Sequence, residues 1–95
     1  MKIYIATEVH YRHKDGTFTI SNFPFSSDLN REKHISNWVE FFTGLHYKYE
    51  RVGTELAFSE KNGEDMHLIK TKEVYLDKVL EKVNFHDPSR DDCYI

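Results

Sequence analysis

The sequence has few of the features that mark secreted, membrane or cofactor-binding proteins. Its single cysteine, Cys93, excludes an intramolecular disulfide, so the fold does not depend on oxidation. No apolar run approaches the roughly 18 residues of a membrane span. The four glycines, at positions 16, 44, 53 and 63, all fall at expected turns or a helix end. None is left for a phosphate-binding loop. We therefore expect a cytoplasmic protein with no membrane association and no cofactor.

The excess of one sign of charge over the other is also modest. The 95 residues include 13 lysines and arginines against 16 acidic residues, which gives a net charge of −3. This balance lacks the basic surface of a protein that binds the nucleic-acid backbone, so direct nucleic-acid binding is not favoured. Aromatic residues make up 15% of the chain and hydrophobic residues 39%, which is enough for one core. We expect a single domain over residues 1–95, with residues 85–95 as a loosely ordered polar tail.

The first 23 residues alternate with the period of a β-strand hairpin. One set of alternating positions is mostly apolar: Ile3, Ile5, Thr7, Val9 and Tyr11. The interleaved set is more polar: Tyr4, Ala6, Glu8, His10 and Arg12. The first set is predicted to face the core and the second to face solvent. A two-residue turn at Asp15 and Gly16 would place Tyr11 opposite Ile20 on the returning strand.

A helix is predicted over residues 29–43. Its apolar stripe has the helical spacing i, i+3, i+4, i+7 and comprises Ile35, Trp38, Val39 and Phe42. Gly44 supplies the expected end of this helix.

The second half of the chain predicts a further hairpin over residues 46–60, with Arg51 opposite Thr54. A strand over residues 66–70 follows, and its alternation leaves open whether His67 and Ile69 or Met66 and Leu68 face the core. Thr71 would begin a last helix whose stripe is Leu76, Val79, Leu80 and Val83. The expected fold is α+β with the order ββαβββα, an antiparallel sheet with both helices packed on one face.

The charged row on the first strand is the main candidate for chemistry. Glu8 could act as a base, His10 as an acid and Arg12 as a phosphate ligand, which are the groups that metal-independent RNA cleavage needs. Charged side chains on the wet face of an antiparallel sheet are, however, most often plain solvated pairs. The spacing of the histidines shows no metal-ligand motif, because His10 and His13 point to opposite faces of a strand. No metal site is therefore expected.

The leading hypothesis is a non-enzymatic module that binds a protein partner. A narrower form is an inhibitor encoded by a phage or mobile element, which would occlude a nucleic-acid-processing enzyme in the host cytoplasm. The expected partner-binding residues are Glu8, His10, Arg12, Phe41, His46, Lys48, Glu50, Asp77 and Glu81. The alternative is a small metal-independent ribonuclease, or an RNA- or nucleotide-binding protein, that uses the open sheet face. A homodimer through an exposed sheet edge is also compatible with the sequence.

Overall fold

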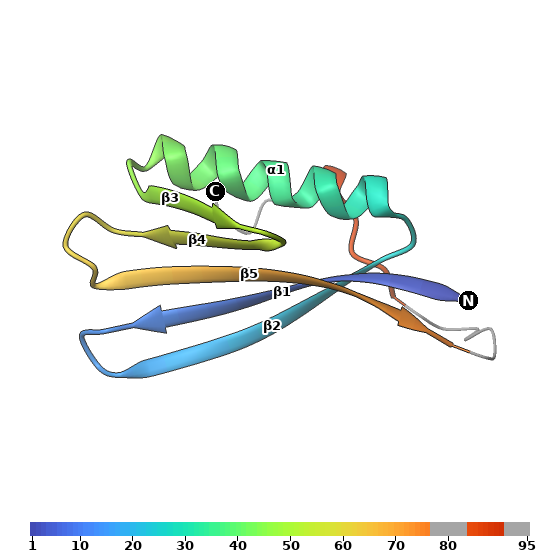
Figure 1. The fold of residues 1–95 in the computed structure, drawn as a ribbon, viewed down its shortest axis with the longest axis horizontal. Coiled ribbons are helices and arrows are strands. Elements are labelled where there is room, and N and C mark those ends of the chain that lie inside the picture. Colours follow the sequence, from blue (N-terminus) through green and yellow to red (C-terminus); the bar gives the residue numbers. More distant parts are fainter. Residues whose placement is uncertain (77–83, 91–95) are drawn as a thin grey trace.

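The computed structural model describes residues 1–76 and 84–90 and shows a five-stranded antiparallel sheet with one long helix on one side (Figure 1). The elements, in chain order, are β1 (Lys2–Arg12), β2 (Thr17–Phe25), α1 (Asp28–Gly44), β3 (Lys48–Val52), β4 (Glu55–Ser59), β5 (Asp65–Tyr75) and the short 3-10 helix η1 (Pro88–Arg90). The strand order is β2-β1-β5-β4-β3. The late strand β5 thus lies in the centre and joins the two hairpins into one sheet. The α+β class and the antiparallel sheet are as predicted.

Helix α1 extends one residue beyond each end of its predicted range, and Leu45 rather than Gly44 is its C-cap. The Ser27 hydroxyl accepts a hydrogen bond from the backbone N–H of Asn30 at 3.2 Å, which satisfies one of the free donors of the first turn. Buried residues on the helix include Ile35, Trp38 and Phe42, members of the predicted stripe. Their burial against the sheet provides most of the stability of this helix.

The core lies between α1 and the sheet. Its buried members are Ala6, Phe25, Ile35, Trp38, Phe42, Leu56, Phe58 and Ile69. They come from the helix and from four of the five strands. Full burial of each large apolar side chain stabilises the folded state by roughly 1.5–3 kcal/mol relative to leaving it in water. The helix and the sheet are therefore held together by one continuous aromatic and aliphatic layer.

The predicted dry face of β1 is not the face that α1 covers, although Ile3 of the predicted dry set is buried. Ala6 is fully buried beneath α1, and alternation places Glu8 and His10 on this same helix-covered face. Ala6 lies opposite Phe23, which packs on Trp38 with ring centroids 5.4 Å apart. A small residue at this position of β1 leaves room for these large rings. Alternation shows which residues share a face, but the bulk of the packing partners decides which face the helix covers.

Two predicted strand registers also differ from the structure. In the first hairpin Tyr11 lies opposite Phe18 and Arg12 opposite Thr17, so residues 13–16 form the loop. Asp15 stabilises this wider loop, since its carboxylate accepts hydrogen bonds from the N–H and O–H groups of Thr17. In the second hairpin Arg51 lies opposite Leu56 rather than Thr54.

The predicted last helix does not begin at Thr71. Residues 71–75 continue β5, which pairs with β1 over its whole length, from Lys2 opposite Tyr75 to Arg12 opposite Asp65. The ladder with β1 already satisfies the backbone groups of this segment, which removes the reason for a helix there. The rest of the predicted helix, including Asp77 and Glu81, lies largely outside the described residues. Within the described ranges, α1 is the one α-helix that packs on the sheet.

The segment expected to be a loose tail is packed in its first part. The backbone N–H of His86 donates to the carbonyl of Pro24 at 2.7 Å, and the His86 ring lies 5.0 Å from that of Phe23. The Asn37 side chain donates to the carbonyl of Pro88 at 3.2 Å. Residues 91–95, including Cys93, lie outside the described residues.

Candidate functional site

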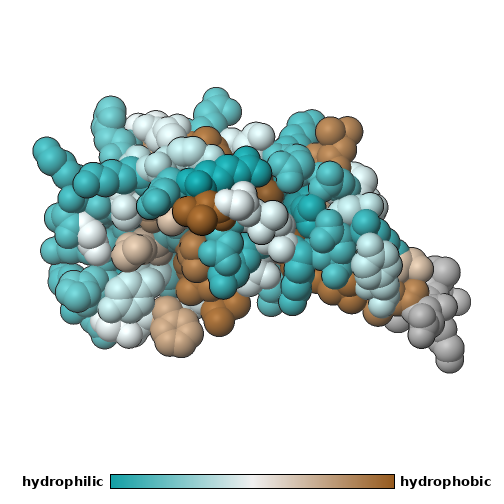
Figure 2. Space-filling model, viewed as in Figure 1, coloured by the Kyte–Doolittle hydropathy of each residue, from teal (hydrophilic) through white to brown (hydrophobic). Residues whose placement is uncertain are grey.

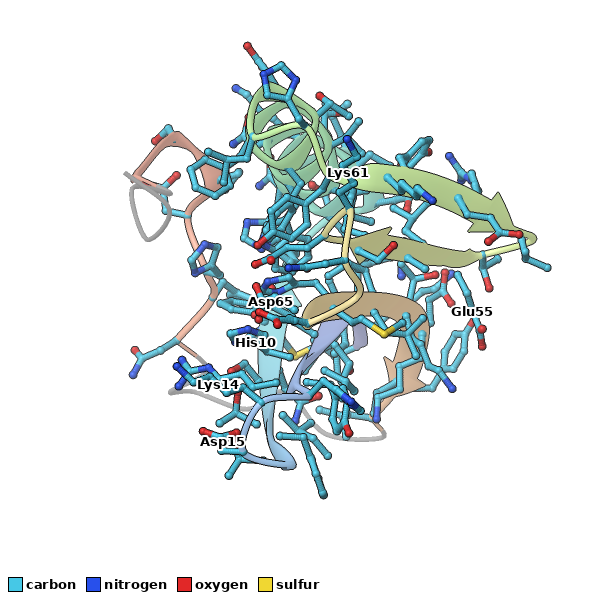
Figure 3. All side chains as sticks on the ribbon, turned by 90° about the vertical axis from the view of Figure 1, so that its left-hand side faces the viewer. His10, Lys14, Asp15, Glu55, Lys61 and Asp65 are labelled. Carbon is cyan, nitrogen blue, oxygen red and sulfur yellow. The ribbon has the colours of Figure 1, made fainter. Side chains whose placement is uncertain are left out.

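A polar cluster forms where the paired strands β1 and β5 approach the end of α1. The register places His10 opposite His67, and the two imidazole rings stack with centroids 4.0 Å apart and an interplanar angle of 14°. Phe42 of α1 packs on the His67 ring, with ring centroids 4.3 Å apart. Figure 3 shows His10 and Asp65 side by side in this region. We call Glu8, His10, Tyr47, Asp65 and His67 the His–Asp cluster.

The carboxylate of Asp65 lies at the centre of this cluster. Its Oδ1 atom is 2.5 Å from His10 Nε2, and its Oδ2 atom is 3.1 Å from His67 Nε2. The hydroxyl of Tyr47 donates to the same Oδ2 atom at 2.8 Å. On the far side of the His67 ring, Nδ1 lies 3.2 Å from Glu8 Oε2. Carboxylates thus face both nitrogens of His67.

Burial and hydrogen bonding fix the ionic states of two members. Burial by itself would raise the pKa of Asp65, but hydrogen bonds from His10 and Tyr47 outweigh it and hold this pKa below its usual value of 3.8. For Tyr47, burial and then the bond to Asp65 raise the pKa well above its usual value of 10.0. At neutral pH Asp65 is therefore a carboxylate and Tyr47 a neutral phenol.

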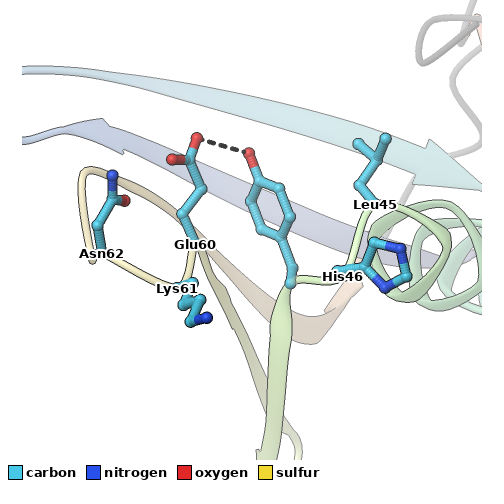
Figure 4. Close-up of a pocket in the computed structure, with 6 residues that line it drawn as sticks. Leu45, His46, Glu60, Lys61 and Asn62 are labelled. Atoms are coloured by element: carbon cyan, nitrogen blue, oxygen red, sulfur yellow. Dashed lines mark hydrogen bonds between the residues drawn. The ribbon is translucent and has the colours of Figure 1, made fainter.

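A pocket of about 750 Å3 opens beside the cluster. It is lined by Leu45, His46, Tyr47, Glu60, Lys61 and Asn62 (Figure 4). The Tyr47 hydroxyl lies 3.1 Å from Glu60 Oε1 as well as close to Asp65, so this side chain joins the pocket to the cluster. His46 adopts a left-handed backbone conformation with φ of 64° where the chain turns from α1 into β3.

The charged residues of β1 and β3 that are expected to bind a partner lie on different faces of the sheet. Glu8 and His10 share a face as expected, but they are partly buried, whereas Arg12 is exposed at the end of β1. Lys48 and Glu50 lie on the edge strand β3, which β4 and β5 separate from β1. Their positions in the register place them on the opposite face of the sheet. The sequence leaves open whether the two groups lie near each other, and the strand order and register place them on opposite faces of the sheet.

The remaining predicted contact residues are also spread out. His46 lines the pocket, while Phe41 is partly buried against the core and packs edge-to-face on Phe42 with ring centroids 5.3 Å apart. Asp77 and Glu81 lie outside the described residues.

Sequence reasoning missed Asp65, Tyr47 and His67 as members of a site. The one available signal was the strand over residues 66–70, for which a core-facing His67 was one of two open alternatives. Its pairing with His10 depends on β5 lying next to β1, and a single sequence does not determine strand order.

The second candidate surface is the sheet face that α1 leaves uncovered. It carries an apolar group that we call the open-face patch: Val9, Tyr11, Phe18, Ile20, Ala57, Met66 and Leu68. Phe18 is 63% exposed, Ile20 58% and Met66 42%. Figure 2 shows apolar residues gathered over the central strands, and a shallow hollow of about 240 Å3 lies within the patch.

Comparison with known protein families, with curated proteins and with solved structures finds no match for this chain. In the part of the chain that the structure describes, no helix combines the length and the apolar character needed to cross a membrane. The case for a function therefore rests on the two surfaces described above.

Proposed function

We propose that this chain is a non-enzymatic binding module that docks on an apolar surface of a protein partner through the open-face patch. The observation that supports this is the exposure of Phe18, Ile20 and Met66 together on one sheet face. Single exposed apolar side chains are common on proteins, but a contiguous group of large ones is typical of an interaction site.

The chemistry of the patch favours a protein over a nucleic acid. Its centre has no charged side chain, and aromatic residues and methionine are the types enriched in protein–protein interfaces. With five strands about 4.8 Å apart and an average strand length of about 27 Å, the whole sheet face covers roughly 650 Å2. A standard interface buries about 800 Å2 on each partner, so the whole sheet face is somewhat smaller than one side of a standard interface. Lys70 and Glu55, 3.4 Å apart, supply a charged rim.

The enzymatic alternative has less support. Glu8, the proposed base, contacts His67, and its side chain is only 12% exposed. Arg12 lies opposite Asp65 in the sheet, where an acidic group competes with a substrate phosphate. The narrower hypothesis of a phage-encoded inhibitor remains compatible with the proposal, in which the patch would occlude a functional surface of an enzyme.

A matched pair of substitutions tests the proposal. The partner is captured on immobilised protein, identified by mass spectrometry, purified, and titrated calorimetrically against the wild type and two variants. Ile20→Lys places a charge in the patch and is expected to weaken binding about 30-fold, which corresponds to about 2 kcal/mol for a hot-spot residue. Leu29→Lys, at a site that is 77% exposed on α1, is expected to bind like the wild type.

Two results would contradict this proposal. Equal affinities of Ile20→Lys and the wild type would exclude the open-face patch as the contact surface. If the wild type alone sediments as a dimer and Ile20→Lys as a monomer, the patch binds a second copy of the chain and not a different protein. Sedimentation velocity on the purified chain is therefore run before any partner is added.

A further inference from the structure

The ligand atoms of His10, Asp65 and His67 all lie within 4.8 Å of one another. We propose that these three side chains bind a divalent transition-metal ion, with zinc as the probe that best matches the donor set. Two imidazole nitrogens and one carboxylate are ligands that Zn²⁺ readily accepts. This site lies on the face opposite the open-face patch, so it is independent of the proposed partner binding.

The first argument is the concentration of hydrogen-bond acceptors in the His–Asp cluster. A neutral imidazole carries one N–H group, yet both nitrogens of His67 face carboxylate oxygens, those of Glu8 and Asp65. Tyr47 has one O–H group, yet its oxygen lies close to both Asp65 and Glu60. These contacts place several acceptor atoms close together, and either a second proton on the His67 ring or a bound cation satisfies them. The two Nε2 atoms and the Asp65 carboxylate are the atoms that would bind the cation.

The second argument is the arrangement of groups around the three ligands. Histidines that bind metals usually donate their other ring N–H group to a carboxylate, which fixes the tautomer and the orientation of the ring. Glu8 occupies this position, since its Oε2 atom is 3.2 Å from His67 Nδ1. Tyr47 holds the Asp65 carboxylate from the side of the pocket. Phe42 packs against the His67 ring and limits its rotation.

The location gives an ion access to these ligands. The side chains of His10 and Asp65 are each 21% exposed, whereas that of His67 is 8% exposed. Tyr47 forms part of the wall of the 750 Å3 pocket, so one side of the cluster faces a water-accessible space. Three protein ligands leave a coordination position for water, as in open zinc sites. The imidazole donors disfavour Mg²⁺, which prefers oxygen ligands.

Calorimetric titration of chelator-treated protein with Zn²⁺ tests the site. We expect saturation at one ion per chain and a rise in melting temperature with added Zn²⁺. Glu8→Gln is expected to weaken binding about 10- to 100-fold, as for other carboxylates that support a ligating histidine. His10→Ala removes a ligand and is expected to weaken Zn²⁺ binding more than Glu8→Gln does. His13→Ala removes an exposed histidine just beyond the same strand and is expected to leave the affinity unchanged.

A measurement on the wild type avoids dependence on variants that fold poorly. Long-range ¹H–¹⁵N spectra report each imidazole nitrogen, and Zn²⁺ is expected to shift the Nε2 resonances of His10 and His67. Absence of binding, or shifts confined to the other histidines, would overturn the proposal. So would an unchanged affinity in a folded His10→Ala variant, or an equal stabilisation by Mg²⁺, which would indicate an adventitious ion only.

Discussion

The chain contains two alanines that lie on opposite faces of the sheet, Ala6 on β1 and Ala57 on β4. Ala6 is fully buried under α1 and lies opposite Phe23, whereas Ala57 is partly exposed in the open-face patch. The same substitution to leucine at each position therefore tests which face forms the core. At Ala6 the larger side chain has no space between Phe23 and the rings of α1, while at Ala57 it extends toward solvent.

Overpacking of a filled core destabilises a protein by about 1–3 kcal/mol, and we expect Ala6→Leu to fall within this range. For a domain of this size each kcal/mol lowers the melting temperature by roughly 4–8 °C. Ala57→Leu is expected to change stability by less than about 0.5 kcal/mol, as is usual for surface sites. Urea unfolding followed by fluorescence measures both, because Trp38 is the only tryptophan and is fully buried in the native state.

The opposite ranking would refute the assignment of faces. If Ala6→Leu is as stable as the wild type and Ala57→Leu is destabilised by more than about 1 kcal/mol, the helix covers the face predicted from alternation alone. The slope of the free energy against urea concentration serves as a control. An unchanged slope shows that both variants unfold in the same way as the wild type.

Three further predictions follow from local contacts. Ser27→Ala removes the side-chain acceptor of the Asn30 N–H group. We expect it to lower the free energy of unfolding, measured in urea, by about 1 kcal/mol. Arg31→Ala removes a nearly buried guanidinium and is expected to cost about 1–3 kcal/mol. Thr17→Val removes the hydroxyl that lowers the pKa of Asp15, so this pKa is expected to rise toward 3.8 in an NMR titration. Because folding lowers this pKa, the Asp15 carboxylate stabilises the folded protein above pH 3.8. This stabilisation is lost as the pH falls through the pKa that Asp15 has in the folded state.

Each of these predictions has a result that would contradict it. A Ser27→Gly variant that is less stable than Ser27→Ala would argue against a capping role, since glycine is the better cap of the two. Wild-type stability in Arg31→Ala would show that its contacts contribute nothing. An unchanged Asp15 pKa in Thr17→Val would mean that the hydroxyl does not bind the carboxylate in solution.

The two proposals concern opposite faces of the sheet and can fail separately. The open-face patch is apolar and exposed, whereas the His–Asp cluster is polar and partly covered by Phe42 of α1. Ile20→Lys is therefore expected to leave Zn²⁺ binding unchanged, and His10→Ala to leave partner binding unchanged. If one variant abolishes both activities, the two sites are coupled or that variant is misfolded, and its melting temperature distinguishes these cases.

The sequence determined the features that depend on neighbours along the chain. The spacing of Ile35, Trp38 and Phe42 specified a helix with one apolar stripe, and Gly44 indicated its end to within one residue. Alternation showed that Glu8 and His10 share one face of a strand. Local turn signals located both hairpins, although the loop at Asp15 and Gly16 is wider than a two-residue turn and shifts the register. These features follow from local geometry, which repeats every two or 3.6 residues.

The tertiary structure decided which of these faces is buried and which distant residues meet. Strand β5 could have continued from Thr71 as a helix, but pairing with β1 keeps residues 71–75 extended. That pairing brings His67 and Asp65 to His10, across more than fifty residues of chain. Local periodicity contains no information about strand order, because strand order is set by the packing of the whole core. The site that combines these three side chains is therefore a property of the fold and not of any segment.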